Sequence, residues 1–247
     1  DVDTTNATGT PAGANVFLSG AANVTLNAGN IKGGTGGIVT LIGANGAGKT
    51  TTVEMIESIR TPTTGSIMLL GEDTKTGFDL VKERISILPQ EFHSFERFTV
   101  RETMTYFSKL YKKRGNIDEI IDAMDLRSHE KQLYRNLSGG LKQRVGVALS
   151  LVNDPEIVFL DEPTSGVDPV SRRSFWELIN RLAGSGTTVF VTTHYLDEAE
   201  YCNRIMLIHA GKIIAGGSPK ELKEEHIRNP ILEVECARVV EALELLQ

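Results

Sequence analysis

The sequence has few cysteines, no long apolar run and no excess of basic residues, and each absence excludes a class of protein. Cys202 and Cys236 are the only cysteines in 247 residues, so we expect no disulfide framework and a reducing cytosol. No apolar run approaches the roughly 18 residues of a membrane-spanning helix, and no signal peptide is expected from the first residues. The net charge of −6 argues against nucleic acid as the main partner, because non-specific binding to it depends on basic side chains.

The rest of the composition is typical of a globular protein with one large domain, or with a domain and a subdomain. Hydrophobic residues make up 40% of the chain and charged residues 23%. Residues 1–37 differ, because about two thirds of them are Gly, Ala, Asn or Thr, a composition typical of loop or disorder. Within this segment, residues 15–18 and 23–26 alternate in polarity and are candidate edge strands.

Residues 43–50 read G-A-N-G-A-G-K-T and match the phosphate-binding pattern G-x-x-x-x-G-K-[ST] at every fixed position. Residues 38–42 predict a buried strand before this loop, and residues 51–59 predict a helix after it. In that context the backbone N–H groups and the helix N-terminus bind phosphates, Lys49 reaches the β- and γ-phosphates, and the Thr50 hydroxyl ligates Mg²⁺. We therefore predict a nucleoside triphosphate site made of Gly43, Asn45, Gly46, Ala47, Gly48, Lys49, Thr50 and Thr51.

Two acidic residues follow a second apolar run. Residues 156–160 predict a strand at the centre of a parallel sheet, and Asp161 and Glu162 come directly after it. Two acids after a strand usually form a solvated turn. Beside a phosphate loop, however, Asp161 is placed to hold Mg²⁺ through water, and Glu162 is placed to act as a general base on an attacking water.

Ser138, Gly139 and Gly140 begin another predicted helix. A hydroxyl and two glycines at a helix start leave N–H groups free to bind an anion, although the same residues also suit a plain N-cap. One nucleotide does not need two phosphate-binding helix starts in one chain. The second start is explained if it contacts the nucleotide held by a partner copy.

The remaining pattern alternates strands with helices, which predicts a parallel sheet covered by helices. Between the first and second halves of this pattern lies a helical insertion at residues 99–136, in which Thr99 and Glu102 form a candidate capping box. Further elements are predicted as strands at 66–70, 85–88, 187–193, 204–209, 212–215 and 231–236, a turn at 71–73, and helices at 169–182, 196–201, 219–225 and 238–246. Two apolar faces are predicted in the insertion, made of Met104, Phe107, Leu110 and Tyr111, and of Ile117, Ile120, Ile121 and Met124.

These motifs together resemble those of the ATP-binding-cassette ATPases, and among them the nucleotide-binding subunits of transporters. Residues 43–50 match the family's Walker A motif, and residues 157–162 resemble Walker B with its catalytic glutamate. Residues 137–141 resemble the signature motif, with Leu141 where glutamine is usual. The resemblance extends over residues 38–220 and covers six motifs in the family's order.

Three of the six motifs are recognised by position. Gln90 falls where the family has its Q-loop glutamine, and His194 falls at the switch histidine. Residues 165–168, which end in Asp168, resemble the D-loop, with Gly-Val in place of the commoner Ala-Leu. Each would be unremarkable alone, because an isolated Gln or His is more often an ordinary loop or packed residue.

The resemblance implies an ABC ATPase fold, in which a P-loop NTPase parallel sheet carries an antiparallel β subdomain and a helical subdomain. It implies that two copies, or this chain and a related ATPase subunit, pair head to tail. ATP and Mg²⁺ would lie between one copy's phosphate loop and the other's Ser138-Gly139-Gly140. In this arrangement Gln90 and His194 contact the metal, the water or the γ-phosphate, and Asp168 crosses the dimer interface. The family usually has an aromatic residue that stacks on adenine, and Gly20 lies near that position in this chain. Phe17 is the nearest aromatic residue and is therefore the candidate.

The resemblance also predicts how the chain divides into domains. We expect an atypical segment at 1–37 that is a candidate antiparallel β subdomain. We expect an ATPase core at 38–90 and 153–220, a helical subdomain at 91–152 that contains the signature motif, and a strand-helix extension at 221–247.

By this resemblance the chain is an ATPase that lies peripherally on the cytoplasmic face of the cell membrane and drives transport, with export favoured, through separate permease subunits. Residues 164–169 and 192–200 most resemble the drug-export type. The docking surface would include Phe92, Phe95, Phe98 and Tyr106, unless these aromatics only pack the helical insertion.

Two alternatives fit less well. A soluble cassette ATPase acting on DNA or ribosomes would carry a coiled coil, zinc-binding cysteines or a second cassette, and none is found in this sequence. A GTPase or small-molecule kinase would leave Ser138-Gly139-Gly140 unexplained, and a GTPase would also need an Asn-Lys-x-Asp motif, which is absent.

Overall fold

A six-stranded sheet in the order β5-β6-β7-β2-β8-β9 forms the centre of the computed structural model, which describes residues 16–19 and 36–226. Strands β2, β5, β6, β7 and β8 run parallel, whereas β9 pairs antiparallel with β8. The predicted α/β fold with a parallel core is therefore confirmed, with one antiparallel edge strand. The bounds are β2 Gly37–Ile42, β5 Ile85–Leu88, β6 Ile157–Asp161, β7 Thr188–Thr193, β8 Arg204–His209 and β9 Lys212–Gly217.

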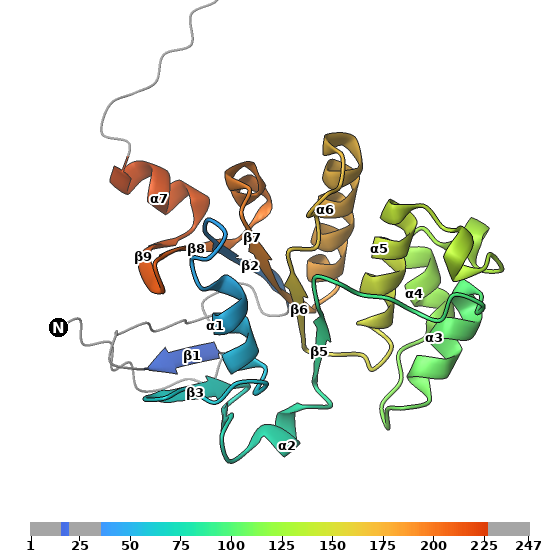
Figure 1. Ribbon diagram of the computed structural model, residues 1–247, viewed down its shortest axis with the longest axis horizontal. Coiled ribbons are helices and arrows are strands. Elements are labelled where there is room, and N and C mark those ends of the chain that lie inside the picture. The colour runs from blue at the N-terminus through green and yellow to red at the C-terminus, as the bar shows by residue number, and fades with distance from the viewer. Residues whose placement is uncertain (1–15, 20–35, 227–247) are drawn as a thin grey trace, which may run out of the picture.

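The sheet is buried on both faces, so that alternate residues of a strand enter two different cores. In β2, Ile38 and Ile42 pack into one core, and Val39 and Leu41 pack into the other. This explains why the strand reads as a continuous apolar run, as central strands of a parallel sheet do. Helix α1 (Lys49–Ile56) covers the second core and α6 (Pro169–Gly184) the first (Figure 1).

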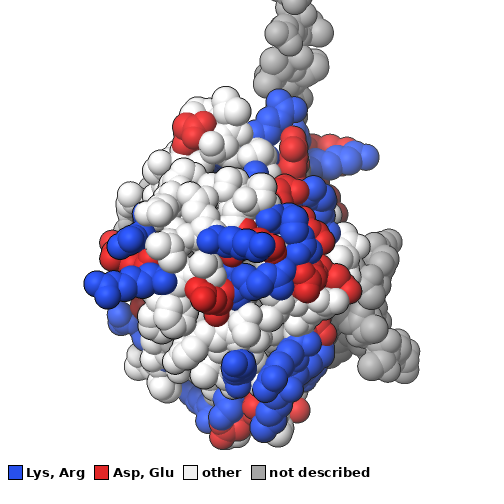
Figure 2. All heavy atoms as spheres, turned by 90° about the vertical axis from the view of Figure 1, so that its right-hand side faces the viewer, with Lys and Arg blue, Asp and Glu red and all other residues white. Residues whose placement is uncertain are grey.

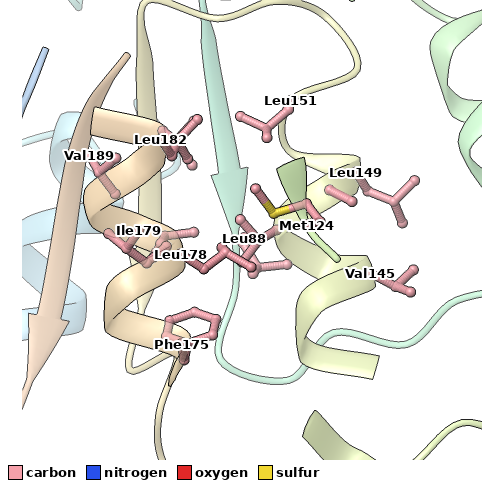
Figure 3. Close-up of a cluster of buried hydrophobic side chains, with 14 of the residues drawn as sticks. Leu88, Met124, Val145, Leu149, Leu151, Phe175, Leu178, Ile179, Leu182 and Val189 are labelled. Carbon is pink, nitrogen blue, oxygen red and sulfur yellow. The ribbon is translucent and has the colours of Figure 1, made fainter. Parts of the chain in front are cut away.

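The larger core joins α6 to the helical part of the molecule. In Figure 3 the apolar side of α6 faces the residues around α5 (Gly139–Leu149) and the end of β5. Residues of this cluster are Leu88, Met124, Val145, Leu149, Leu151, Phe175, Leu178, Ile179 and Leu182. Because α5 begins after Ser138 and α6 begins after Asp168, this packing fixes two of the predicted functional segments relative to each other.

A small antiparallel sheet in the order β1-β3-β4 lies beside α1 (Figure 1). Its strands are β1 (Val16–Ser19), β3 (Ser66–Leu69) and β4 (Glu72–Asp73). The prediction of a turn at 71–73 was wrong in part, because the chain reverses at Leu70 and Gly71, which have φ of 52° and 88°, and then pairs back onto β3. The predicted strand at 23–26 lies outside the described residues.

The helical region contains α3 (Val100–Ser108), α4 (Ile117–Ala123) and α5, with the short helices η2 (Arg127–His129) and η3 (Tyr134–Asn136) between α4 and α5. The predicted capping box of Thr99 and Glu102 is confirmed. Leu110 was predicted to be buried but is 64% exposed, because α3 ends at Ser108 and Leu110 lies beyond the helix.

The remaining helices are α2 (Phe78–Val81), η4 (Leu196–Tyr201) and α7 (Pro219–His226). Helix α1 ends at Ile56 rather than at the predicted Ile59, because Ser58 adopts a φ of 59° that stops the helix. The strand predicted at 231–236 and the helix predicted at 238–246 lie outside the described residues.

Within residues 36–226, no helix has the length and apolar character needed to cross a bilayer. On the face seen in Figure 2, basic and acidic side chains are intermingled rather than separated into patches of one charge. Among the described residues, Arg101 and Arg127 both donate to the Asp118 carboxylate at 2.7 Å. These two hydrogen bonds lower the pKa of Asp118 to about 2.

Candidate active site

The phosphate loop lies between β2 and α1 and turns sharply enough to need glycine. Gly48 has a φ of 103°, which L-residues rarely adopt, and a Cβ at Gly43 would lie 2.4 Å from the Ile208 carbonyl oxygen. Lys49 begins α1 and is 5% exposed. Its Nζ donates to the carbonyl oxygens of Gly43 at 2.9 Å and Ala44 at 3.3 Å, so the ammonium is held within the loop.

Glu162 brings together three of the predicted site residues. One carboxylate oxygen, Oε1, lies 3.0 Å from Lys49 Nζ. The other, Oε2, lies 3.1 Å from His194 Nδ1 and accepts a hydrogen bond from Gln90 Nε2 at 3.5 Å. Gln90 follows β5, His194 follows β7 and Lys49 begins α1, while Glu162 itself follows β6. The parallel strands thus bring these residues to one edge of the sheet, where such folds bind ligands.

Glu162 itself has a strained backbone. Its φ of 45° is uncommon for a residue with a side chain, and such conformations cluster at functional sites. The conformation is stabilised by a hydrogen bond from the Glu162 N–H to Thr192 Oγ1 at 2.9 Å.

Asp161 links the phosphate loop to the strand beside it. Thr50 Oγ1 donates to Asp161 Oδ2 at 3.3 Å, and Thr192 Oγ1 donates a short hydrogen bond to Asp161 Oδ1. Thr192 therefore contacts both acids, a role that the sequence analysis missed. Strand β7 contains three threonines, and only the strand order and register place Thr192 opposite Asp161.

The donor set suits Mg²⁺. The Thr50 hydroxyl and the Asp161 carboxylate offer two hard oxygen ligands side by side, and Mg²⁺ commonly binds one or two protein oxygens together with phosphates and water. No group of three or more His, Cys, Asp or Glu side chains within residues 36–226 forms a separate all-protein metal site.

A pocket of about 300 Å³ opens over these residues. Gln90 and Glu162 line it together with six residues of the phosphate loop and α1, which are Asn45, Gly46, Gly48, Lys49, Thr50 and Thr51. His194 is not in its lining but reaches it through Glu162. The sequence thus identified every residue that lines this pocket, and Ala47 is the loop residue that turns inward, at 6% exposed.

Ser138 and Gly140 line a second pocket of about 330 Å³, which in the described part of the chain shares no residue with the first. Ser138 Oγ caps α5 by accepting from the Leu141 N–H at 3.3 Å. A Cβ at Gly139 or Gly140 would meet no atom within 4 Å, so the start of α5 is open to an approaching group. The N-cap alternative is thus fulfilled, and the open start keeps the anion-site alternative possible.

Asp168 is not among the residues that line either pocket. Asp168 is the N-cap of α6 and accepts from the N–H groups of Val170 at 3.1 Å and Ser171 at 3.0 Å. Hydrogen bonds from Ser171, followed by that from the Val170 backbone, lower the Asp168 pKa. Phe17 is in β1, where its backbone pairs opposite Met68, and its side chain lies outside the described part of the structure.

Glu57, at the end of α1, is a buried acid that the sequence analysis did not identify. It is 5% exposed, and burial, followed by the negative charges of Asp161 and Glu54, raises its pKa to about 7. Glu57 is therefore about half protonated near pH 7 and largely neutral at lower pH.

Comparison with known proteins places these features in a family. The model of the ABC transporter family matches residues 26–165, which is more than half of the chain. The probable multidrug ABC transporter ATP-binding protein YbhF of Escherichia coli (strain K12) is 43% identical over 195 residues, which cover 77% of this chain and 34% of YbhF. The Nod factor export ATP-binding protein I of Burkholderia pseudomallei (strain 1710b) is 38% identical over 200 residues, which cover 78% of this chain and 66% of that protein.

The same similarity is found among solved structures. CbiO1 of Clostridium perfringens, described as part of the ABC transporter complex cbiONQ, superposes with a TM-score of 0.72 at 25% identity, covering 82% of this chain and 83% of that one. The chain spans about a third of the length of YbhF and about two thirds of the Nod factor export protein, so the activities of those whole proteins are not carried over by similarity alone.

Proposed function

This chain belongs to the ABC transporter family, and we propose that it is an ATP-binding and ATP-hydrolysing subunit that drives export through separate membrane-spanning subunits. The observation that carries the proposal is the convergence on Glu162 of Lys49, Gln90 and His194, within 3.0 to 3.5 Å of its carboxylate. A carboxylate, an amide and an imidazole beside a phosphate loop are the groups needed to position a water and stabilise phosphoryl transfer.

Each side chain has a distinct task in this proposal. The phosphate-loop N–H groups and the Lys49 ammonium hold the β- and γ-phosphates, while Thr50 and Asp161 hold the metal. Mg²⁺, when bound, supplies positive charge against the phosphate oxygens. Glu162 accepts a proton from the attacking water, and Gln90 and His194 orient that carboxylate, which both contact at Oε2.

The second pocket supports the proposal that a partner ATPase subunit completes the site, either another copy of this chain or a related subunit. Ser138 and Gly140 do not line the pocket over the phosphate loop, so one chain does not close both groups around one nucleotide. In a head-to-tail pair, the open start of α5 in each copy would contact the phosphates held by the other. Asp168, whose loop precedes α6, would lie at the same interface.

An aromatic cluster in the helical region is the proposed contact with the membrane-spanning subunits. Phe95 is 44% exposed and Tyr106 is 45% exposed, and their ring centroids lie 5.2 Å apart. Phe98 lies 5.0 Å from Phe95, so three rings form one surface. Exposed aromatic surfaces of this kind are enriched at protein interfaces. Such docking would place the chain on the cytoplasmic face of the cell membrane.

Export is favoured because the relatives compared above are named for multidrug transport and Nod factor export. The same names give no support to a soluble ATPase that acts on DNA or ribosomes.

Replacement of the proposed base tests the function. We expect Glu162→Gln to lower ATP hydrolysis by about 100-fold or more, because general-base catalysis contributes typically that much, while ATP affinity changes little. Hydrolysis is measured by phosphate release and affinity by equilibrium binding of ATP. The control is Glu177→Gln, a matched change on the outer side of α6, where the side chain is 67% exposed. Turnover equal to that of the control would remove Glu162 from this role.

A further inference from the structure

Arg172 connects the two loops that carry Glu162 and His194. It lies in the first turn of α6 and is 15% exposed. Its Nη2 donates to the Val167 carbonyl oxygen at 3.3 Å, in the loop after Glu162. Its guanidinium carbon lies 3.7 Å from the centre of the Tyr195 ring, in the loop after His194. A planar guanidinium can stack on the ring while its edge donates to the carbonyl oxygen, whereas an ammonium has no plane with which to stack.

Glu198 completes the connection from the other side. It is fully buried in η4, near the Arg172 guanidinium, with Nε and Oε1 3.7 Å apart. The same Oε1 accepts a hydrogen bond of 2.6 Å from the hydroxyl of Thr164, two residues after Glu162. Arg172, Glu198 and Thr164 thus form a buried polar link, which we call the loop clasp. Burying a charge pair costs free energy, so the clasp is not explained by packing alone.

The loop clasp is not fully closed. Arg172 Nε and Glu198 Oε2 are both buried and have no hydrogen-bond partner in the described part of the chain. The 3.7 Å between Nε and Oε1 exceeds a normal N–H···O distance by about 0.5–1 Å. Unpaired buried polar atoms favour any small movement that pairs them. A slight approach of the two loops would therefore be stabilised by the clasp.

The two loops position the proposed chemistry directly. Tyr195 follows His194 and the two rings are in contact, with centroids 4.0 Å apart. His194 Nδ1 in turn lies 3.1 Å from Glu162 Oε2. A displacement of either loop changes the distance between the imidazole and the carboxylate.

We propose that Arg172 and Glu198 are positioning residues for ATP hydrolysis, which hold the loop after Glu162 against the loop after His194. The inference rests on the proposed function, because it concerns the rate of that reaction. Neither residue lines the pocket over the phosphate loop, so the clasp acts on the geometry of Glu162 and His194 and not on ATP affinity.

The test compares Arg172→Lys with Arg173→Lys in the full chain. Arg173 is the next residue, but its side chain is 77% exposed and pairs with Glu177 on the outside of α6. We expect Arg172→Lys and Glu198→Gln each to lower kcat about tenfold, because a small misplacement of catalytic groups is costly. KM and the ATP dissociation constant should stay within about twofold of wild type. Arg173→Lys should leave all three unchanged.

Three further measurements separate positioning from simple structural damage. The double variant Arg172→Lys/Glu198→Gln should be no slower than the slower single variant, since both changes break one link. Thr164→Ser, which keeps the hydroxyl, should retain the wild-type kcat, whereas Thr164→Val should lose about tenfold. Without nucleotide, amide exchange at Ser165 and Val167, whose N–H groups bond to Glu162 and Thr164 carbonyls, should be faster in Arg172→Lys than in Arg173→Lys.

Three results would overturn the inference. If the wild type is active and Arg172→Lys has the same kcat as Arg173→Lys, the role of the loop clasp is wrong and the proposed function is unaffected. A parallel loss of kcat, ATP affinity and protection across the whole chain shows a structural role instead. A wild-type protein that binds Mg²⁺ and ATP without turnover contradicts the proposed function, and the role in hydrolysis fails with it.

Discussion

Glu57 shows how strongly one buried residue depends on its surroundings. Its carboxyl group lies at the end of α1, near Asp161, and burial is the main cause that raises its pKa to about 7. In the unfolded chain the pKa is near the ordinary value of 4.5. At pH values between about 4.5 and about 7, Glu57 keeps its proton in the folded protein but releases it in the unfolded chain. The free energy of unfolding therefore falls as the pH rises from about 4.5 to about 7.

We expect Glu57→Gln to remove this loss, because glutamine does not ionise. The quantity to compare is the free energy of unfolding of the variant minus that of wild type. This difference should be larger at pH 8 than at pH 4.5 by on the order of 2 kcal/mol, allowing for partial screening by solvent. Urea unfolding of both proteins at the two pH values measures this difference. Glu177→Gln serves as the exposed control, which should show no such pH dependence. A difference between Glu57→Gln and wild type that is constant with pH would contradict the raised pKa.

At the same scale, the sequence predicted the residues that belong to contiguous motifs and missed those brought together by folding. Lys49 and Thr50 belong to a short pattern with fixed spacing, and the strand and helix around them were also predictable. Thr192 and Arg172 belong to no such pattern. Their partners lie about 30 residues away or on another element, so only the register of β6 against β7 and the start of α6 define their roles.

Helix α6 begins at a residue with two separable tasks. Asp168 caps the helix by accepting from the N–H groups of Val170 and Ser171, and we propose that it also lies at the interface with a partner subunit. A helix start needs only an acceptor, so asparagine can replace aspartate there, whereas alanine cannot. The two tasks therefore respond differently to substitution.

We expect Asp168→Ala to lower the melting temperature, and Asp168→Asn to leave it near that of wild type. Both variants should hydrolyse ATP more slowly if the carboxylate also contacts the partner. Thermal unfolding followed by circular dichroism and phosphate release measure the two effects. Full activity of Asp168→Asn would limit Asp168 to the capping task, and equal melting temperatures for Ala and Asn would contradict that task.

Elements were predicted best where local chemistry ends them. The Thr99 capping box depends on residues close together in the sequence. The same holds for the reversal between the predicted strands at 204–209 and 212–215, where Ala210 and Gly211 have φ of 47° and 75°. The end of α1 and the exposure of Leu110 were not predicted, because a positive φ at Ser58 and the stop of α3 at Ser108 depend on the tertiary surroundings. The order of strands in the sheet also could not be predicted from the sequence, because each buried strand has the same apolar pattern.

At the scale of the whole molecule, the described part of one chain carries two pockets that our proposal assigns to one nucleotide. One is lined by the phosphate loop with Gln90 and Glu162, and the other by the start of α5 with the loop before α6. Since the two linings share no residue, our proposal needs a second chain to close the site. An antiparallel pair places each phosphate loop opposite the other chain's Ser138, as the symmetry of a closed dimer allows.

Dimerisation should therefore depend on the nucleotide. We expect Glu162→Gln, which retains ATP, to double in mass by light scattering when Mg²⁺ and ATP are added and to remain monomeric without them. The triphosphate adds contacts to both chains at once, and slow hydrolysis prevents their loss. Adding Ser138→Ala to this variant removes one contact of the partner chain, so the dimer should need about tenfold more protein to form.

The double variant also decides which chain Ser138 serves. If Ser138 contacts the partner's nucleotide, ATP affinity measured at protein concentrations too low for dimers should be the same with and without Ser138→Ala. If that affinity instead falls, Ser138 contacts the nucleotide of its own chain, and the head-to-tail pairing is wrong. A Glu162→Gln protein that binds ATP and stays monomeric at every concentration would favour a related subunit as the partner, because the open start of α5 would then meet a different phosphate loop.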